Sequence, residues 1–240
     1  MNSEYIEFCI PTKCGSAMWS SLMIRYTTGK LPRHFPEPWL GTDLRINGFD
    51  HHKLLNNRVN KTIFISRHPF SRFLSGYLDK AATFDRRAKF YFEGRWNATP
   101  ESFRTFVTKF SETYPNIGNH FAKLHFLPID HYYECANRSS VHYKLEHMSE
   151  WYPSFVQKYN MVSAVNDPHW EGGCWWRRTN STCNNSLIPT RAKNCLITRN
   201  KHHKNSCSVI NKYYDETTKS LIYKIFKNDF IRSNYTTYEF

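Results

Sequence analysis

The chain has 240 residues, of which 33 are Lys or Arg and 20 are Asp or Glu, so its formal net charge is +13 at pH 7. Its 40% hydrophobic and 17% aromatic content excludes a disordered chain, and its length favours one domain with a sizeable core over residues 1–240. The positive charge favours an anionic partner, such as nucleic acid, a membrane surface, a nucleotide or an acidic glycan, although it also serves general solubility.

The first 30 residues predict a strand, a turn and a helix. Tyr5 to Ile10 is rich in aromatic and β-branched residues, which favours a strand, and the apolar residues from about Met18 recur at helical spacing. The turn between them holds Lys13, Gly15 and Ser16. Glycine lets the backbone approach a ligand closely, lysine adds charge, and a helix N-terminus binds phosphate. The turn is therefore a candidate phosphate site, unless it is an ordinary connection with a solvated lysine.

Residues 62–80 predict a second unit of the same kind. The apolar run from Thr62 to Ser66 predicts a buried strand, and Pro69 suits the first turn of a helix, where its missing N–H is not needed. Arg67 lies between strand and helix, and Arg72 and Ser75 share one helix face because they are three residues apart. These groups suit a second phosphate; the alternative is a basic amphipathic helix whose arginines are solvated.

The two strand–turn–helix units predict the α/β class, with a central parallel sheet and flanking helices. Thr99 is a suitable N-cap and Pro100 a suitable first residue for a helix that runs to about Phe110. A long helix from about Val209 to Asn228 is expected to close the domain. Residues 166–208 are an irregular, basic, cysteine-rich insertion within it.

The two segments resemble motifs of the Golgi carbohydrate sulfotransferases, which sulfate chondroitin, dermatan and related glycans. The second segment matches the pattern Arg-x-Pro-Phe-x-Arg-x-x-Ser-x-Tyr at Arg67, Pro69, Phe70, Arg72, Ser75 and Tyr77. The first keeps the Lys13-to-Trp19 spacing of Pro-Lys-x-x-x-x-x-Trp, but Thr12 separates Pro11 from Lys13. Stretches at 99–110, 125–135 and 213–235 extend the resemblance in order over nearly the whole chain, with Phe126 where tryptophan is usual.

The resemblance implies a P-loop-like sulfotransferase fold and a donor, 3′-phosphoadenosine 5′-phosphosulfate (PAPS). It implies that the 5′-phosphosulfate is held by Lys13, Cys14, Gly15, Ser16 and Ala17. It also implies that the 3′-phosphate is bound by Arg67 and Ser75, with Arg72 on the same helix face. Ala17 stands where a hydroxyl or amide side chain is common in the family.

Sulfuryl transfer requires a base that takes the proton of the attacking hydroxyl group. Our choice is His125, which lies in the family-like stretch, with His120 and Glu146 as lesser candidates. Lys13 would stabilise charge on the leaving phosphate oxygen. No metal is expected, because the His and Cys residues show no compact ligand spacing.

The resemblance places the protein in the Golgi lumen, normally with a membrane anchor, although no signal or transmembrane segment is visible in this sequence. Six Asn-x-Ser/Thr sites agree with a lumenal protein: Asn60, Asn97, Asn137, Asn180, Asn184 and Asn234. Four of the seven cysteines lie between Cys174 and Cys207, which predicts one or two disulfides there. The odd total leaves at least one thiol, for which we favour Cys9 or Cys14.

Three functions compete for this chain. The first is PAPS-dependent sulfuryl transfer to a hydroxyl of an acidic glycan, with basic aromatic stretches at 81–97 and 166–208 as candidate rims for the acceptor. The second is a nucleotide kinase, which the absence of a Walker loop disfavours. The third is a non-catalytic basic module that binds sulfated glycan or nucleic acid. Donor binding distinguishes the first from the third.

Overall fold

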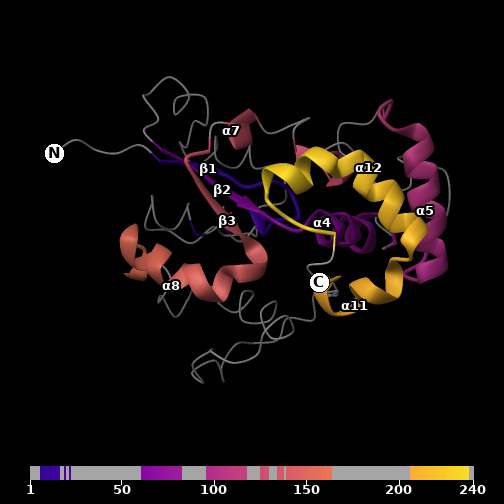
Figure 1. Cartoon of the computed structure of the whole chain (residues 1–240). Helices are drawn as coiled ribbons and strands as arrows, with labels where there is room; N and C mark the ends of the chain where they lie inside the picture. The colour runs from indigo at the N-terminus through magenta and orange to yellow at the C-terminus, as the bar shows by residue number, and fades with distance from the viewer. Residues whose placement is uncertain are drawn as a thin grey trace, which may run out of the picture. The chain divides into compact units, whose positions relative to one another are not determined.

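The chain of the computed structural model divides into two compact units. Figure 1 shows its helices and strands. The first unit comprises residues 1–66 and 135–198, and the second comprises 67–134 and 199–240. The structure describes residues 6–16, 19, 22, 61–82, 96–117, 125–129, 134–137, 139–163 and 206–237. The short helix α7 (Glu134–Asn137) lies where the two units join along the chain.

The first unit is built on a three-stranded parallel sheet, which confirms the predicted α/β class. Its strands are β1 (Ile6–Cys9), β2 (Lys61–Ser66) and β3 (Val141–Lys144), in the order β1-β2-β3. The central strand β2 is buried from Thr62 onward, as expected for a strand paired on both sides. The strand β3 was not predicted, because its four residues carry too short an apolar pattern to stand out.

An aromatic core packs against this sheet. The helix α8 (Met148–Lys158) contributes Phe155, which is 1% exposed, and Trp151, whose Nε1 donates to the carbonyl oxygen of Lys144 over 2.8 Å. The Trp151 ring stacks between Tyr143 on β3 and Trp19, with centroid distances of 4.5 and 5.8 Å. Trp19 is thereby held at a fixed place in the core, and this matters for the turn that precedes it.

The second unit contains the helices predicted from residues 62–80 and 99–110. The helix α4 (Pro69–Gly76) begins with the expected proline and continues into the π-helical turn η1 (Tyr77–Ala81). The helix α5 (Pro100–Thr113) also begins with proline, and its N-cap Thr99 accepts a hydrogen bond from the backbone N–H of Ser102, as predicted. Both helix starts are thus local properties of the sequence.

Phenylalanine rings form the core of the second unit. Phe73 of α4 is 1% exposed and contacts five other rings at centroid distances of 5.0–6.1 Å. These rings belong to Phe103, Phe106, Phe110, Phe126 and Phe226. Edge-to-face geometry predominates, which suits the quadrupoles of aromatic rings. One ring therefore links α4, α5, the segment at 125–129 and α12 (Glu216–Arg232).

The prediction of one long helix over 209–228 was wrong. The structure has α11 (Ser206–Tyr213) and then α12, which begins at Glu216. Asp215 is the N-cap of α12 and forms a capping box with Thr218, and these short side chains compete with a continuing helix for the backbone N–H groups. Tyr214 lies at the break and donates its hydroxyl to the carbonyl oxygen of Phe70 over 2.9 Å.

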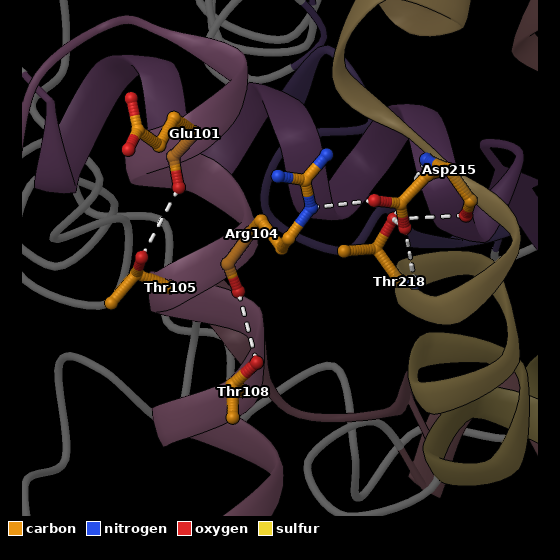
Figure 2. A network of polar contacts seen from close by, with 6 residues as sticks. All are labelled: Glu101, Arg104, Thr105, Thr108, Asp215 and Thr218. Atoms are coloured by element: carbon orange, nitrogen blue, oxygen red, sulfur yellow. Dashed lines mark hydrogen bonds and ion pairs between the residues drawn. The ribbon is translucent and has the colours of Figure 1, made fainter.

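Asp215 also joins α12 to α5, as Figure 2 shows. Its carboxylate accepts from Arg104 Nε over 2.6 Å while it caps the backbone N–H of Thr218 over 2.8 Å. The hydrogen bond that the carboxylate accepts from the backbone N–H of Thr218, and then the one from Arg104, lower the pKa of Asp215 to about 2. The carboxylate form is therefore the one that stabilises the start of α12.

We expect Asp215→Ala to lower the free energy of unfolding by about 0.5–2 kcal/mol, because the helix loses its N-cap. Asp215→Asn keeps a capping oxygen but loses the charge. Since the folded pKa lies below the unfolded one, the charge stabilises fully above about pH 4, and this contribution is lost as pH falls towards about 2. Urea unfolding at pH 3 and pH 6 should show less pH dependence in Asp215→Asn. Glu101→Gln, an exposed carboxylate in the first turn of α5 that has no capping role, is the control and should change the pH dependence less than Asp215→Asn.

Candidate functional site

The turn after β1 holds Lys13 in a conformation that lysine seldom adopts. The backbone N–H of Cys14 donates to the carbonyl oxygen of Pro11 over 3.0 Å, and Lys13, third in this four-residue turn, has a φ of +68°. A positive φ at this place is typical of a type II turn, where glycine or asparagine is usual. Strained conformations of this kind persist mainly at functional sites. The geometry therefore supports the prediction that Lys13 serves a ligand.

Gly15 is required by the same turn. Its φ is +78°, and a Cβ added there would lie 3.4 Å from Cδ1 of Trp19 and 3.9 Å from Cδ1 of Leu145. Trp19 is fully buried, and its backbone N–H donates to the carbonyl oxygen of Gly15 over 3.0 Å. Residues of positive φ on either side of Cys14 give the alternating backbone of anion-binding nests.

The turn fits an anionic group in a further respect. The indole Nε1 of Trp19 is buried, has no hydrogen-bond partner among the described residues, and lies 3.5 Å from the point that a Cβ on Gly15 would occupy. A buried donor of this kind ordinarily has a partner.

The other predicted residues of this turn are placed as follows. Cys14 is buried and forms no disulfide, and Ser16 is half-buried. Ala17 lies outside the described residues.

In the second unit, the other predicted phosphate ligands lie on α4 and just before it. Arg67 and Ser75 are both half-buried, so their side chains reach the surface of the unit. The N-cap His68 does not cap the helix with its side chain, since its Nε2 lies 3.0 Å from the carbonyl oxygen of Thr236, and the first turn holds no acidic residue. The first turn of α4 therefore contributes no carboxylate that would neutralise the helix dipole at this end.

Arg72 is placed differently from Arg67 and Ser75. Its side chain is 1% exposed, and its Nη2 donates to the carbonyl oxygen of Leu127 and lies 3.6 Å from the Asp229 carboxylate, itself 1% exposed. The helical spacing of Arg72 and Ser75 is as predicted. The structure adds that the guanidinium contacts other parts of the same unit.

The candidate bases lie in different units. His125 belongs to the second unit and is 2% exposed. Glu146 belongs to the first, in the 3₁₀ turn η4 (Leu145–His147), beside the Leu145 side chain that approaches Gly15. His120 lies outside the described residues. The structure thus groups Lys13, Cys14, Gly15, Ser16 and Glu146 in one unit, and Arg67, Arg72, Ser75 and His125 in the other.

A hydrogen-bonded pair that the sequence did not reveal lies at the end of the sheet. Ser66, the last residue of β2, places its Oγ 2.6 Å from Nε2 of His142 on β3, whose ring stacks on Phe64 with centroids 4.9 Å apart. Burial, and then the charge of Lys144, lowers the pKa of His142 to about 4. His142 is therefore neutral at pH 7. No local signal identifies this pair, because the pairing of β2 with β3 brings it together.

This pair predicts a pH dependence of stability. The folded pKa of His142 lies below its unfolded value of about 6.5, so the unfolded chain binds the extra proton and stability falls as pH drops from about 6.5 towards 4. His142→Gln retains a hydrogen-bonding group but cannot titrate. Urea unfolding between pH 4 and pH 7 should show a shallower decline for His142→Gln than for wild type. If stability declined equally with pH in the two proteins, the lowered pKa of His142 would be contradicted.

The described residues contain no group of three or more His, Cys, Asp or Glu side chains that is arranged to hold a metal ion. Within the same residues, none of the helices combines the length and the apolar character needed to span a bilayer. The expected absence of a metal stays a prediction.

The comparisons with known proteins support the family resemblance. A model of the sulfotransferase family matches residues 3–236 of the chain. No significant match was found among curated proteins or among solved structures. The family match covers nearly the whole chain and includes both the turn at Lys13 and the helix that follows Arg67.

Proposed function

Because the chain belongs to the sulfotransferase family, we propose that it transfers a sulfuryl group from PAPS to a hydroxyl group of a glycan acceptor, as a single catalytic domain over residues 1–240. The family implies PAPS as the donor. One observation carries the proposal to these residues: the strained turn at Lys13 leaves the carboxyl end of β1, and Arg67 follows the carboxyl end of β2, its parallel neighbour. In α/β proteins, ligands bind at that edge of the sheet.

The donor would be held at its two anionic ends. Lys13 and the backbone N–H groups of Cys14 to Ser16, continuing to Ala17, would bind the 5′-phosphosulfate, as the positive φ angles of this turn support. Arg67 and Ser75 would bind the 3′-phosphate with help from the first turn of α4. Arg72 was predicted to contribute to the same phosphate, although its Nη2 contacts Leu127 and Asp229 within the unit.

PAPS supplies an activated sulfuryl group, whose bond to a phosphate oxygen breaks as a bond to the acceptor oxygen forms. Lys13 would stabilise the negative charge that develops on the departing phosphate oxygen. His125 would accept the proton of the acceptor hydroxyl group. The carbonyl oxygen of His125 lies 3.1 Å from the point that a Cβ on Gly76 would occupy, which places this residue beside α4, the helix that carries Ser75.

We propose that the acceptor is an acidic glycan. We also propose that the protein acts in the Golgi lumen and is held there by a membrane anchor, as is normal for the family that it resembles. The net charge of +13 suits an acidic chain. The N-glycosylation sites Asn97, Asn137 and Asn234 are exposed, so glycans could be attached to them. Cys9 is disulfide-bonded, which suits an oxidising compartment. A shift in mass on removal of N-glycans from protein expressed in a secretory cell would support lumenal exposure; an unglycosylated chain would count against it.

The proposal is tested first by calorimetric titration with 3′-phosphoadenosine 5′-phosphate, the desulfated donor. Wild type is expected to bind, and the Arg67→Ala, Ser75→Ala double variant to bind at least about 100-fold more weakly, since each lost hydrogen bond to a charged group contributes about 1.5–3 kcal/mol. Lys212→Ala, an exposed lysine on α11, is the control. A folded wild type without affinity would reject the proposal and leave the non-catalytic basic module.

A further inference from the structure

A buried ion pair is hydrogen-bonded to the main chain of the segment that carries His125. Arg72 on α4 and Asp229 on α12 lie 3.6 Å apart, and each is 1% exposed. Arg72 Nη2 donates to the carbonyl oxygen of Leu127. The backbone N–H of Ile129 donates to both carboxylate oxygens of Asp229 over 2.9 and 3.0 Å. Both charges are thus directed at the main chain two and four residues beyond His125.

The segment also approaches α4 so closely that a side chain at the contact would push its neighbours aside by a few tenths of an ångström. A Cβ added at Gly76 would lie 3.0 Å from the Phe126 ring and 3.1 Å from the carbonyl oxygen of His125. The backbone of Gly76 has an ordinary helical φ of −60°, so close packing and not backbone conformation accounts for the glycine. The phenyl ring of Phe126 lies 5.5 Å from that of Phe73. The segment is therefore fastened at Phe126, Leu127 and Ile129 in turn.

We propose that Arg72 and Asp229 are positioning residues, which fix the backbone of residues 125–129 so that His125 stands in one place beside α4. This inference rests on the proposed function, in which His125 is the base and α4 carries Ser75. It gives Arg72 a role that its place in the Arg67–Tyr77 segment does not suggest, because its Nη2 group binds the protein itself.

Stability alone does not account for this pair. Replacing a buried ion pair by apolar residues of similar volume is often neutral or stabilising, so a pair that only filled space would be dispensable. Here both partners also bind main-chain atoms of one segment, and the Arg72 guanidinium lies over the Phe226 ring at 5.6 Å. Nε and Nη1 of Arg72 have no partner among the described residues, so a direct contact with the donor is the alternative to be tested.

The test uses the full chain and the double variant Arg72→Met, Asp229→Leu, which removes both charges and leaves neither one buried alone. The matched control is Glu216→Gln, Lys219→Gln, which removes an exposed ion pair of 3.0 Å from the same helix, α12. Three quantities are measured: amide hydrogen exchange of Ile129, affinity for 3′-phosphoadenosine 5′-phosphate, and kcat with KM for sulfuryl transfer.

We expect the Arg72→Met, Asp229→Leu variant to remain folded and to bind the nucleotide as wild type does. Its Ile129 amide should exchange about tenfold faster or more, because local opening no longer breaks the bonds to Asp229. Its kcat should fall by about 10- to 100-fold with little change in the donor KM, since small misplacement of a catalytic group has effects of this size. The control should match wild type in all three.

Two results would overturn the inference. Loss of nucleotide affinity as large as in the Arg67→Ala, Ser75→Ala double variant would make Arg72 a donor ligand, and unchanged exchange and kcat would make the pair dispensable. Failure of the proposed function is seen separately, because wild type itself would then bind no nucleotide. In that event the exchange of Ile129 still decides whether the pair holds this segment.

Discussion

Replacing Lys13 by asparagine is expected to lower kcat for sulfuryl transfer by about 10²–10³-fold, the usual effect of removing one group that stabilises transition-state charge. The same change should leave the protein as stable as wild type or more so. Lys13 has a φ of +68°, and asparagine tolerates that conformation better than lysine. The two effects are expected to have opposite signs, because the positive φ of Lys13 costs stability while its proposed role is to bind the donor.

The measurement pairs steady-state kinetics, with an acceptor found by screening acidic glycans, with urea unfolding of the same samples. Lys158→Asn, an exposed lysine at the end of α8, is the control and should change neither quantity appreciably. A Lys13→Asn protein with wild-type kcat would remove Lys13 from the mechanism. A protein that lost activity together with stability would show that the turn needs lysine for folding.

Replacing Phe73 by alanine is expected to destabilise the second unit by about 3–5 kcal/mol, the usual range for removing a buried phenyl ring. Phe73 is 1% exposed and contacts Phe110 at 5.0 Å and Phe126 at 5.5 Å between centroids. The cavity would remove support from α4 and from the segment that carries His125, so activity should fall as well.

Urea unfolding followed by aromatic fluorescence measures this loss. Ile231→Ala is the control, because Ile231 is an apolar residue on α12 that is 65% exposed, and its effect should stay within about 0.5 kcal/mol. An effect of Phe73→Ala no greater than that of Ile231→Ala would contradict the central place that the structure gives to the Phe73 ring.

Most elements near the candidate site were predictable because their signals are local. The strands β1 and β2 follow from short apolar runs. The helices α4 and α5 begin at prolines, and proline is favoured in the first turn of a helix. The same segments carry the residues Lys13, Arg67 and Ser75, whose spacing indicated the family that the comparison with family models then confirmed.

The elements that were missed depend on partners distant in the chain. The strand β3 has only four residues and is recognisable only when paired with β2, which also creates the Ser66–His142 pair. The break between α11 and α12 was overlooked because the apolar spacing continues across it, whereas the capping box at Asp215 ends the helix.

The sequence by itself determined the α/β class, the family and the two segments proposed to hold the donor, because each rests on residues that are neighbours in the chain. Only the tertiary structure decided what those residues contact. It gave Lys13 a positive φ, it placed Gly15 against Trp19, and it directed Arg72 to Leu127 and Asp229. The physical reason is that burial and ion pairing depend on which segments meet in space, and residues 72, 127 and 229 meet only in the folded unit.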